Sequence, residues 1–153
     1  MKLAEALILR ADCQKRIEQL RERLVRSAKV QEGEQPPENP QALIAELEAT
    51  VNELTDSIKR INKTNSLTML QDNMSITDAL AERDTLLLKR RVYDNLVNAG
   101  AYSSTRYSQA EIKSFSTVNI AELQAQMDRM SRDIRELDTK IQESNWNTEL
   151  IEH

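Results

Sequence analysis

One apolar stripe near the end of the chain constrains the fold more than any other sequence feature. Between residues 118 and 146, apolar side chains recur at alternating steps of three and four, which places them on one face of a helix about 40 Å long. The members of this stripe are Ile120, Leu123, Met127, Met130, Ile134, Leu137 and Ile141. A stripe this long and narrow has to be covered by other helices, so the sequence predicts a mainly α protein.

Signals for helix ends divide the rest of the chain into further helices. Asn39 has the position of an N-cap, with Pro40 at the first helical position, and Gly100 is expected as a C-cap. Asn119 and Glu122 have the spacing of a capping box at the start of the last helix. The predicted helices cover residues 2–30, 40–63, 77–98 and 119–145.

The third predicted helix differs from the others because its apolar and basic residues are mixed. Its expected apolar face consists of Leu80, Leu87, Leu88, Val92 and Leu96. Asp84 and Arg91 lie seven residues apart, on or beside that face. This face is predicted to point into the protein.

A small β element is expected between the second and third helices. Residues 67–76 read as a β-hairpin with a turn at Asp72 and Asn73. Because an isolated hairpin is marginally stable in water, it is expected to lie on the helices or to gain a third strand. The alternation of side chains in residues 112–118 makes that segment the candidate strand.

These elements predict an antiparallel bundle of four long helices with a small β-hairpin or three-stranded insertion. The length of 153 residues fits one domain, and we expect residues 1–153 to form it. The composition agrees, because two glycines, three prolines and 30% charged residues are typical of long helices that pack together.

Charge and hydrophobicity argue against two classes of partner. The net charge of -4 does not favour nucleic acid, which binds clustered basic faces. No run approaches the roughly 20 apolar residues that span a bilayer, and the first residues lack the features of a signal peptide. Cys13 is the only cysteine, so no internal disulfide is possible. We therefore expect a cytoplasmic protein without membrane contact.

Residue types needed for catalysis are scarce. The only histidine is His153, and two glycines cannot form a phosphate-binding loop. Cys13 is expected to be a small buried apolar residue. Four carboxylates have two interpretations, a metal site or a solvated, helix-capping face, and the second is favoured. These residues are Asp78, Glu82, Asp84 and Glu111. The sequence thus predicts no enzyme, no cofactor and no metal.

A group of polar residues around the third helix has two interpretations. One is a hydrogen-bond network that holds the hairpin to the helices. The other is a pocket for a small polar or anionic ligand, with Trp146 closing the end of the last helix or forming a subunit contact. The candidate ligand-binding residues are Asn62, Asn65, Asp78, Arg83, Asp84, Arg91, Tyr107, Glu111 and Trp146.

Several segments of the chain, taken in order, resemble one family. They include KLAEALILRADCQKRIEQLRERL, IKRINKTN, TDALAERD, RYSQAEIK and RELDTKIQESNWNTEL. Together they resemble the septicolysin-like family of small bacterial proteins, most of which have no known function. The resemblance covers nearly the whole chain and implies a helical fold. Because the family is named after a reported oxygen-labile haemolysin, it also implies a membrane-active cytolysin as an alternative function.

The number and length of the apolar stripes predict self-association. Three or four helices of unequal length rarely bury every stripe within one chain, and burial of the remainder favours association by about 25 cal/mol per Å². The leading hypothesis is a non-enzymatic, self-assembling intracellular protein that binds a partner or a small ligand. We expect a homo-oligomer with helix–helix contacts and strand pairing between subunits.

Overall fold

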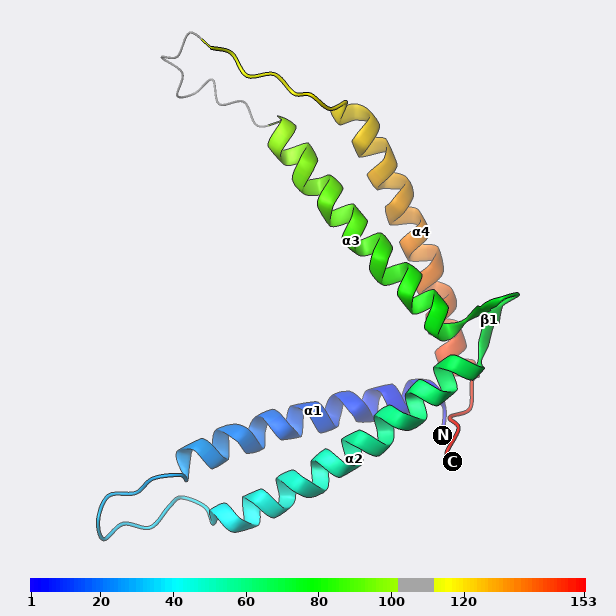
Figure 1. The fold of residues 1–153 in the computed structure, drawn as a ribbon. Helices are drawn as coiled ribbons and strands as arrows, with labels where there is room; N and C mark the ends of the chain where they lie inside the picture. Colours follow the sequence, from blue (N-terminus) through cyan, green and yellow to red (C-terminus); the bar gives the residue numbers. More distant parts are fainter. Residues whose placement is uncertain (102–111) are drawn as a thin grey trace. The chain divides into compact units, whose positions relative to one another are not determined.

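Long helices dominate the computed structural model of the chain (Figure 1). The structure describes residues 1–101 and 112–153, and in these residues it contains four helices and one β-hairpin. The elements in chain order are α1 (Leu3–Arg26), α2 (Pro40–Leu67), β1 (Met69–Gln71), β2 (Met74–Ser75), α3 (Ile76–Ala101) and α4 (Ile120–Asn147). The predicted mainly α fold of four long helices with a small β-hairpin is confirmed.

The described residues group into two compact units. The first unit contains Met1–Met69 and Glu143–His153, and it is built on α1 and α2. The second unit lies within Leu70–Gln142 and contains α3 and most of α4. The expected single domain over residues 1–153 stays a prediction.

In the first unit, α1 and α2 form a helical hairpin, with the two helices side by side along their length (Figure 1). After Leu3 and Ala4, the buried positions of α1 and its C-cap recur every seven residues, at Ala6, Cys13, Leu20 and Ser27. A seven-residue repeat is the signature of helices that pack with nearly parallel axes. Three of these four side chains are small, so they fill little of the space between the two helices.

Local signals set the start of two helices as predicted. The Asn39 side chain accepts a hydrogen bond from the Gln41 amide at 3.0 Å, and Pro40 occupies the first position of α2. The Asn119 side chain accepts from the Glu122 amide at 3.1 Å at the start of α4. Both predicted N-caps are confirmed.

The start of α1 is held by the end of the chain instead of by a side-chain cap. The Leu3 amide donates to the Thr148 carbonyl at 2.9 Å, and the Leu150 amide donates to the Met1 carbonyl at 2.8 Å. Lys2 and Glu149 form an antiparallel bridge between these two bonds. Backbone groups of the last residues thus satisfy donors that a free helix end would leave to water.

The β-hairpin forms as predicted, but it stays two-stranded. Asn73 takes a left-handed backbone conformation with φ of 61°, which suits the tight turn after Asp72. The predicted third strand at residues 112–118 is wrong, because the sheet contains only β1 and β2 in the described part of the chain. Ile112 and Phe115 are 84% and 81% exposed, so alternation in this segment reflects no buried face.

Candidate functional site

Within the second unit, α3 faces α4 with arginine side chains. Arg83 donates from Nη1 to Oδ1 of Asp138 at 2.9 Å, and Arg90 donates from Nε to Oγ of Ser131 at 2.7 Å. The later residue of α3, Arg90, contacts the earlier residue of α4, Ser131, so the two helices are antiparallel. Val97 is buried seven residues beyond Arg90, on the same side of α3.

The apolar face predicted for α3 is on the wrong side of the helix. Leu88 and Val92 are each 56% exposed, and Leu96 is 39% exposed. At about 100° per residue, Leu88 lies opposite Val97 on the helix, Val92 lies about 140° from it, and Leu96 lies about 100° from it, so all three side chains point away from the side that carries Val97. We call them the outer stripe of α3. The prediction failed because long arginine stems, which are not counted as apolar, occupy the side that faces α4.

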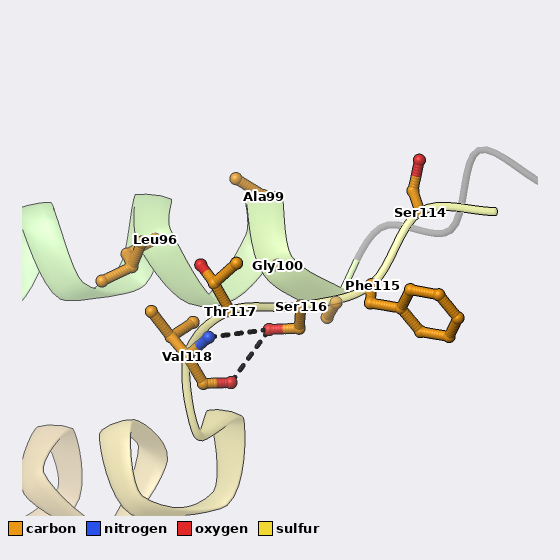
Figure 2. Close-up of a pocket in the computed structure, with 9 residues that line it drawn as sticks. Leu96, Ala99, Gly100, Ser114, Phe115, Ser116, Thr117 and Val118 are labelled. Atoms are coloured by element: carbon orange, nitrogen blue, oxygen red, sulfur yellow. Dashed lines mark hydrogen bonds between the residues drawn. The ribbon is translucent and has the colours of Figure 1, made fainter. Parts of the chain in front are cut away.

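A cavity of about 330 Å³ lies where the outer stripe ends (Figure 2). It is formed by the last turn of α3 and the segment that leads into α4, and its lining residues are Leu96, Ala99, Gly100, Ala101, Ser114, Phe115, Ser116, Thr117 and Val118. Phe115 projects into solvent at its rim. The outer stripe and this cavity therefore form one partly apolar surface, which includes Leu96 in both parts.

Gly100 allows the two walls of this cavity to meet. A Cβ atom at Gly100 would lie 2.9 Å from Cδ1 of Ile120 and 3.0 Å from Oγ of Ser116. α3 continues to Ala101, so Gly100 lies inside the helix and the predicted C-cap at Gly100 is wrong. The missing side chain gives room for this close approach to side-chain atoms of the second wall, and no positive φ is involved.

Ser116 shapes the segment that forms the second wall. Its Oγ donates to the Val118 carbonyl at 2.9 Å and accepts from the Val118 amide at 3.3 Å (Figure 2). A side chain that bonds its own backbone two residues ahead favours a turn over an extended ladder. This local bond is a physical reason why residues 112–118 do not continue as a strand.

Two opposite charges lie at one edge of the outer stripe. Asp84 and Arg91 are both exposed and are two helical turns apart, so they share a side of α3. Asp84 Oδ1 lies 3.5 Å from Nε of Arg83 on the same helix. The edge of the stripe thus presents a negative charge toward the start of α3 and a positive charge toward its middle.

The predicted ligand-binding residues divide between the two units. Asn62 is exposed on α2, Asn65 is buried on α2 and Trp146 is 53% exposed near the end of α4, all within the first unit. The second unit holds Asp78, Arg83, Asp84 and Arg91. Tyr107 and Glu111 lie outside the described residues. The ligand site made of these residues stays a prediction.

Asp78 has a structural role that its sequence position indicated. Its Oδ2 accepts from the Ser75 amide at 3.1 Å, and the Asp78 amide donates to Oγ of Ser75 at 3.1 Å. This reciprocal pair is a capping box at the start of α3. It agrees with the helix-capping interpretation of this carboxylate.

The described residues contain neither a metal-binding cluster nor a membrane-spanning helix. Residues 1–101 and 112–153 contain no group of three or more His, Cys, Asp or Glu side chains placed to hold a metal ion. In the same part of the chain, no helix has the length and the apolar character needed to cross a membrane.

Comparisons with known proteins give a family and one solved relative. A model of a family of unknown function, DUF6847, matches residues 10–150. The chain is 42% identical to a protein whose crystal structure is described as that of a functionally unknown conserved protein from Corynebacterium diphtheriae. The match covers 99% of each chain with a TM-score of 0.93. No curated protein matches the chain.

These matches correct the resemblance drawn from the sequence. Neither the family nor the solved relative has a link to septicolysin, so the assignment to a septicolysin-like family is wrong. The cytolysin alternative depended on that assignment and loses its support with it. The shared segments reflect a family whose activity is unknown.

Proposed function

This chain belongs to DUF6847, a family of unknown function, and we propose that it is a non-enzymatic protein that associates with a second copy of itself through α3. The observation that carries the proposal is the outer stripe, in which Leu88 and Val92 are each 56% exposed. A helix with apolar residues on two opposite sides is typical of a helix packed between neighbours on both sides.

The surface around the outer stripe supports a protein partner. Phe115 and Ile112 are more than four-fifths exposed, at 81% and 84%. Large exposed apolar side chains beside a partly apolar cavity are a feature of interaction sites in soluble proteins. Burial against another apolar surface would stabilise a complex by about 25 cal/mol per Å².

The charges at the edge of the stripe favour a second copy as that partner. In an antiparallel pair of α3 helices with a two-fold axis between residues 87 and 88, Asp84 lies level with Arg91 of the partner subunit. The symmetry repeats the contact, so both charges of each copy are matched. Leu88 lies beside the axis and packs against Leu88 of the partner subunit.

We also propose the cytoplasm as the compartment. Cys13 is a free and buried thiol in a chain with no other cysteine. Chains of this size that work in oxidising compartments commonly depend on disulfides. Fractionation of cells that produce the protein at natural levels tests this assignment.

Sedimentation equilibrium of the full chain tests self-association, and charge reversal tests its location. We expect a dimer at micromolar concentration. Val92→Glu should weaken it by about 100-fold, because a carboxylate would be buried at the contact. Asp84→Arg and Arg91→Asp should each weaken it by about tenfold through repeated like-charge contacts, and the double reversal should restore it.

Asp128→Arg provides the matched control, because Asp128 is an exposed carboxylate of α4. This change should leave the dimer intact. A monomeric wild type over the same concentrations would rule out the proposal. A dimer that tolerates Val92→Glu and both single reversals would place the contact elsewhere.

A further inference from the structure

Another cavity lies in the first unit, between α1 and α2, with a volume of about 200 Å³. Small side chains explain its presence, because Ala6 and Cys13 of α1 and Ser57 of α2 all line it. Leu9 and Leu150 add apolar walls. The hollow therefore has an apolar floor at a point where the helices would otherwise pack tightly.

The same cavity is lined by three charged residues of α2, which are Glu53, Asp56 and Arg60. The charge of Glu53 is already neutralised by Arg16 of α1. Arg16 donates from Nη2 to Oε2 of Glu53 at 3.1 Å and lies 3.4 Å from Sγ of Cys13. Asp56 and Arg60 also line the cavity, one helical turn apart. Within the described residues neither of these two forms an ion pair with another side chain.

We propose that this cavity binds a small zwitterion, an aliphatic α-amino acid. Its ammonium group pairs with Asp56 and its carboxylate with Arg60, while the aliphatic side chain lies against Leu9 and Leu150. One unpaired charge of each sign matches a ligand that carries both charges. A simple anion would leave Asp56 unmatched, and a simple cation would leave Arg60 unmatched.

The size of the cavity limits the ligand. It is smaller than the roughly 300–1,000 Å³ of sites for drug-sized molecules. A ligand of about nine non-hydrogen atoms is expected to bind with a Kd of about 1 mM. Such an affinity suits a metabolite that is abundant in cells.

NMR titration of the full chain with L-leucine tests the proposal. The methyl signals of Ala6, Leu9 and Leu150 should shift with a Kd of about 1 mM. Isovalerate lacks the ammonium group and isoamylamine lacks the carboxylate, so each should bind at least about tenfold more weakly. Equal binding of either comparator, or no shift with about 50 mM leucine, would overturn the proposal.

Charge-neutralising variants locate the site. Asp56→Asn and Arg60→Gln should each raise the Kd for leucine about tenfold. Both residues are exposed, so neither change should disturb folding. Asp12→Asn and Arg21→Gln are matched controls on exposed positions of α1, outside the cavity lining, and should bind as the wild type does. Unchanged affinity in both cavity variants would refute the site. The test is independent of self-association, because α3 contributes nothing to this cavity.

Discussion

Arg83 in α3 and Asp138 in α4 form an ion pair across the second unit, with Nη1 2.9 Å from Oδ1. The side chains are 26% and 45% exposed, so the pair is partly shielded from water. Nε of Arg83 is buried and has no hydrogen-bond partner in the described residues, although Asp84 lies 3.5 Å away. The contact between α3 and α4 thus depends on a charged group that is incompletely satisfied.

Removing the carboxylate should destabilise this unit. Asp138→Ala leaves the Arg83 guanidinium without its best acceptor, and we expect a loss of about 1 kcal/mol in the free energy of unfolding measured with urea. Replacing both residues by leucine should recover that loss, because an apolar contact needs no desolvated charge. The exposed Asp133 of α4 serves as control, and an equal loss in Asp133→Ala would contradict the explanation.

Thr64 should stabilise the end of the chain through one hydrogen bond. It is fully buried, and its Oγ1 accepts from the Ile151 amide at 2.9 Å while it donates to the Arg60 carbonyl at 2.8 Å. Thr64→Val keeps the shape but removes the acceptor, which should cost about 1–2 kcal/mol. Amide exchange at Ile151 should accelerate in this variant and stay slow in Thr64→Ser, which retains the hydroxyl. Unchanged exchange in Thr64→Val would show that the bond is not needed.

Glu38 should make the first unit sensitive to acid. Arg23 donates from Nε to Oε2 of Glu38 at 2.9 Å, and this hydrogen bond lowers the pKa of Glu38 below its ordinary value of 4.5. A lowered folded-state pKa means that the stabilisation is complete above about pH 4.5 and is lost as the pH falls through the folded value.

Thermal unfolding of the wild type and Glu38→Gln over a range of pH measures this effect. The wild type should have the higher Tm near neutral pH, and the difference should shrink as the pH falls below about 4.5. Because the pair is largely exposed, about 1 M salt should also reduce the difference. Glu32→Gln alters an exposed glutamate of the same loop and should give no such trend. A difference that grows toward low pH would have the wrong sign.

The two glycines should respond differently to alanine. Gly33 has a φ of 86° with no atom within 4 Å of an added Cβ, so Gly33→Ala should cost about 1 kcal/mol through backbone strain alone. At Gly100 the added Cβ meets the flexible end of Ile120, and the gain of about 1 kcal/mol in helix propensity offsets the crowding. Urea unfolding of both variants checks the order, and a larger loss at Gly100 would reverse it.

The features predicted correctly from the sequence are those set by neighbouring residues. Asn39 and Asn119 cap their helices, and the Asp72–Asn73 turn forms, because each depends on a few adjacent backbone groups. The helices also extend close to their predicted bounds. Local hydrogen bonding and periodicity suffice for such features.

The features that were missed depend on residues far away in the chain. Which side of α3 faces α4 depends on whether Arg83 finds Asp138, and no local pattern contains that information. The third strand failed for the same reason, since alternation predicts a strand only where an edge is available for pairing. The contact of Leu3 with Thr148 has no sequence signal at all.

Part of the surface formed by the outer stripe and the adjoining cavity could be predicted from the sequence. Leu88, Val92 and Leu96 were identified as one apolar face, and Asp84 and Arg91 as charges beside it. Their exposure could not be predicted, because burial depends on the partner helix that α3 selects. The sequence predicted that Gly100 ends a helix. Its role in allowing the two cavity walls to meet depends on its proximity to Ile120 and Ser116, which no local pattern indicates.

The bond between Leu3 and Thr148 has a consequence for the order of events during synthesis. A ribosome releases Leu3 and the rest of α1 first, whereas Thr148, which follows α4 in the chain, emerges much later. α1 can pair with α2 early, but its first turn gains its backbone partner only after α4 has been synthesised. A nascent chain halted before Thr148 therefore carries an unfinished first helix, which a chaperone or protease meets before the finished protein exists.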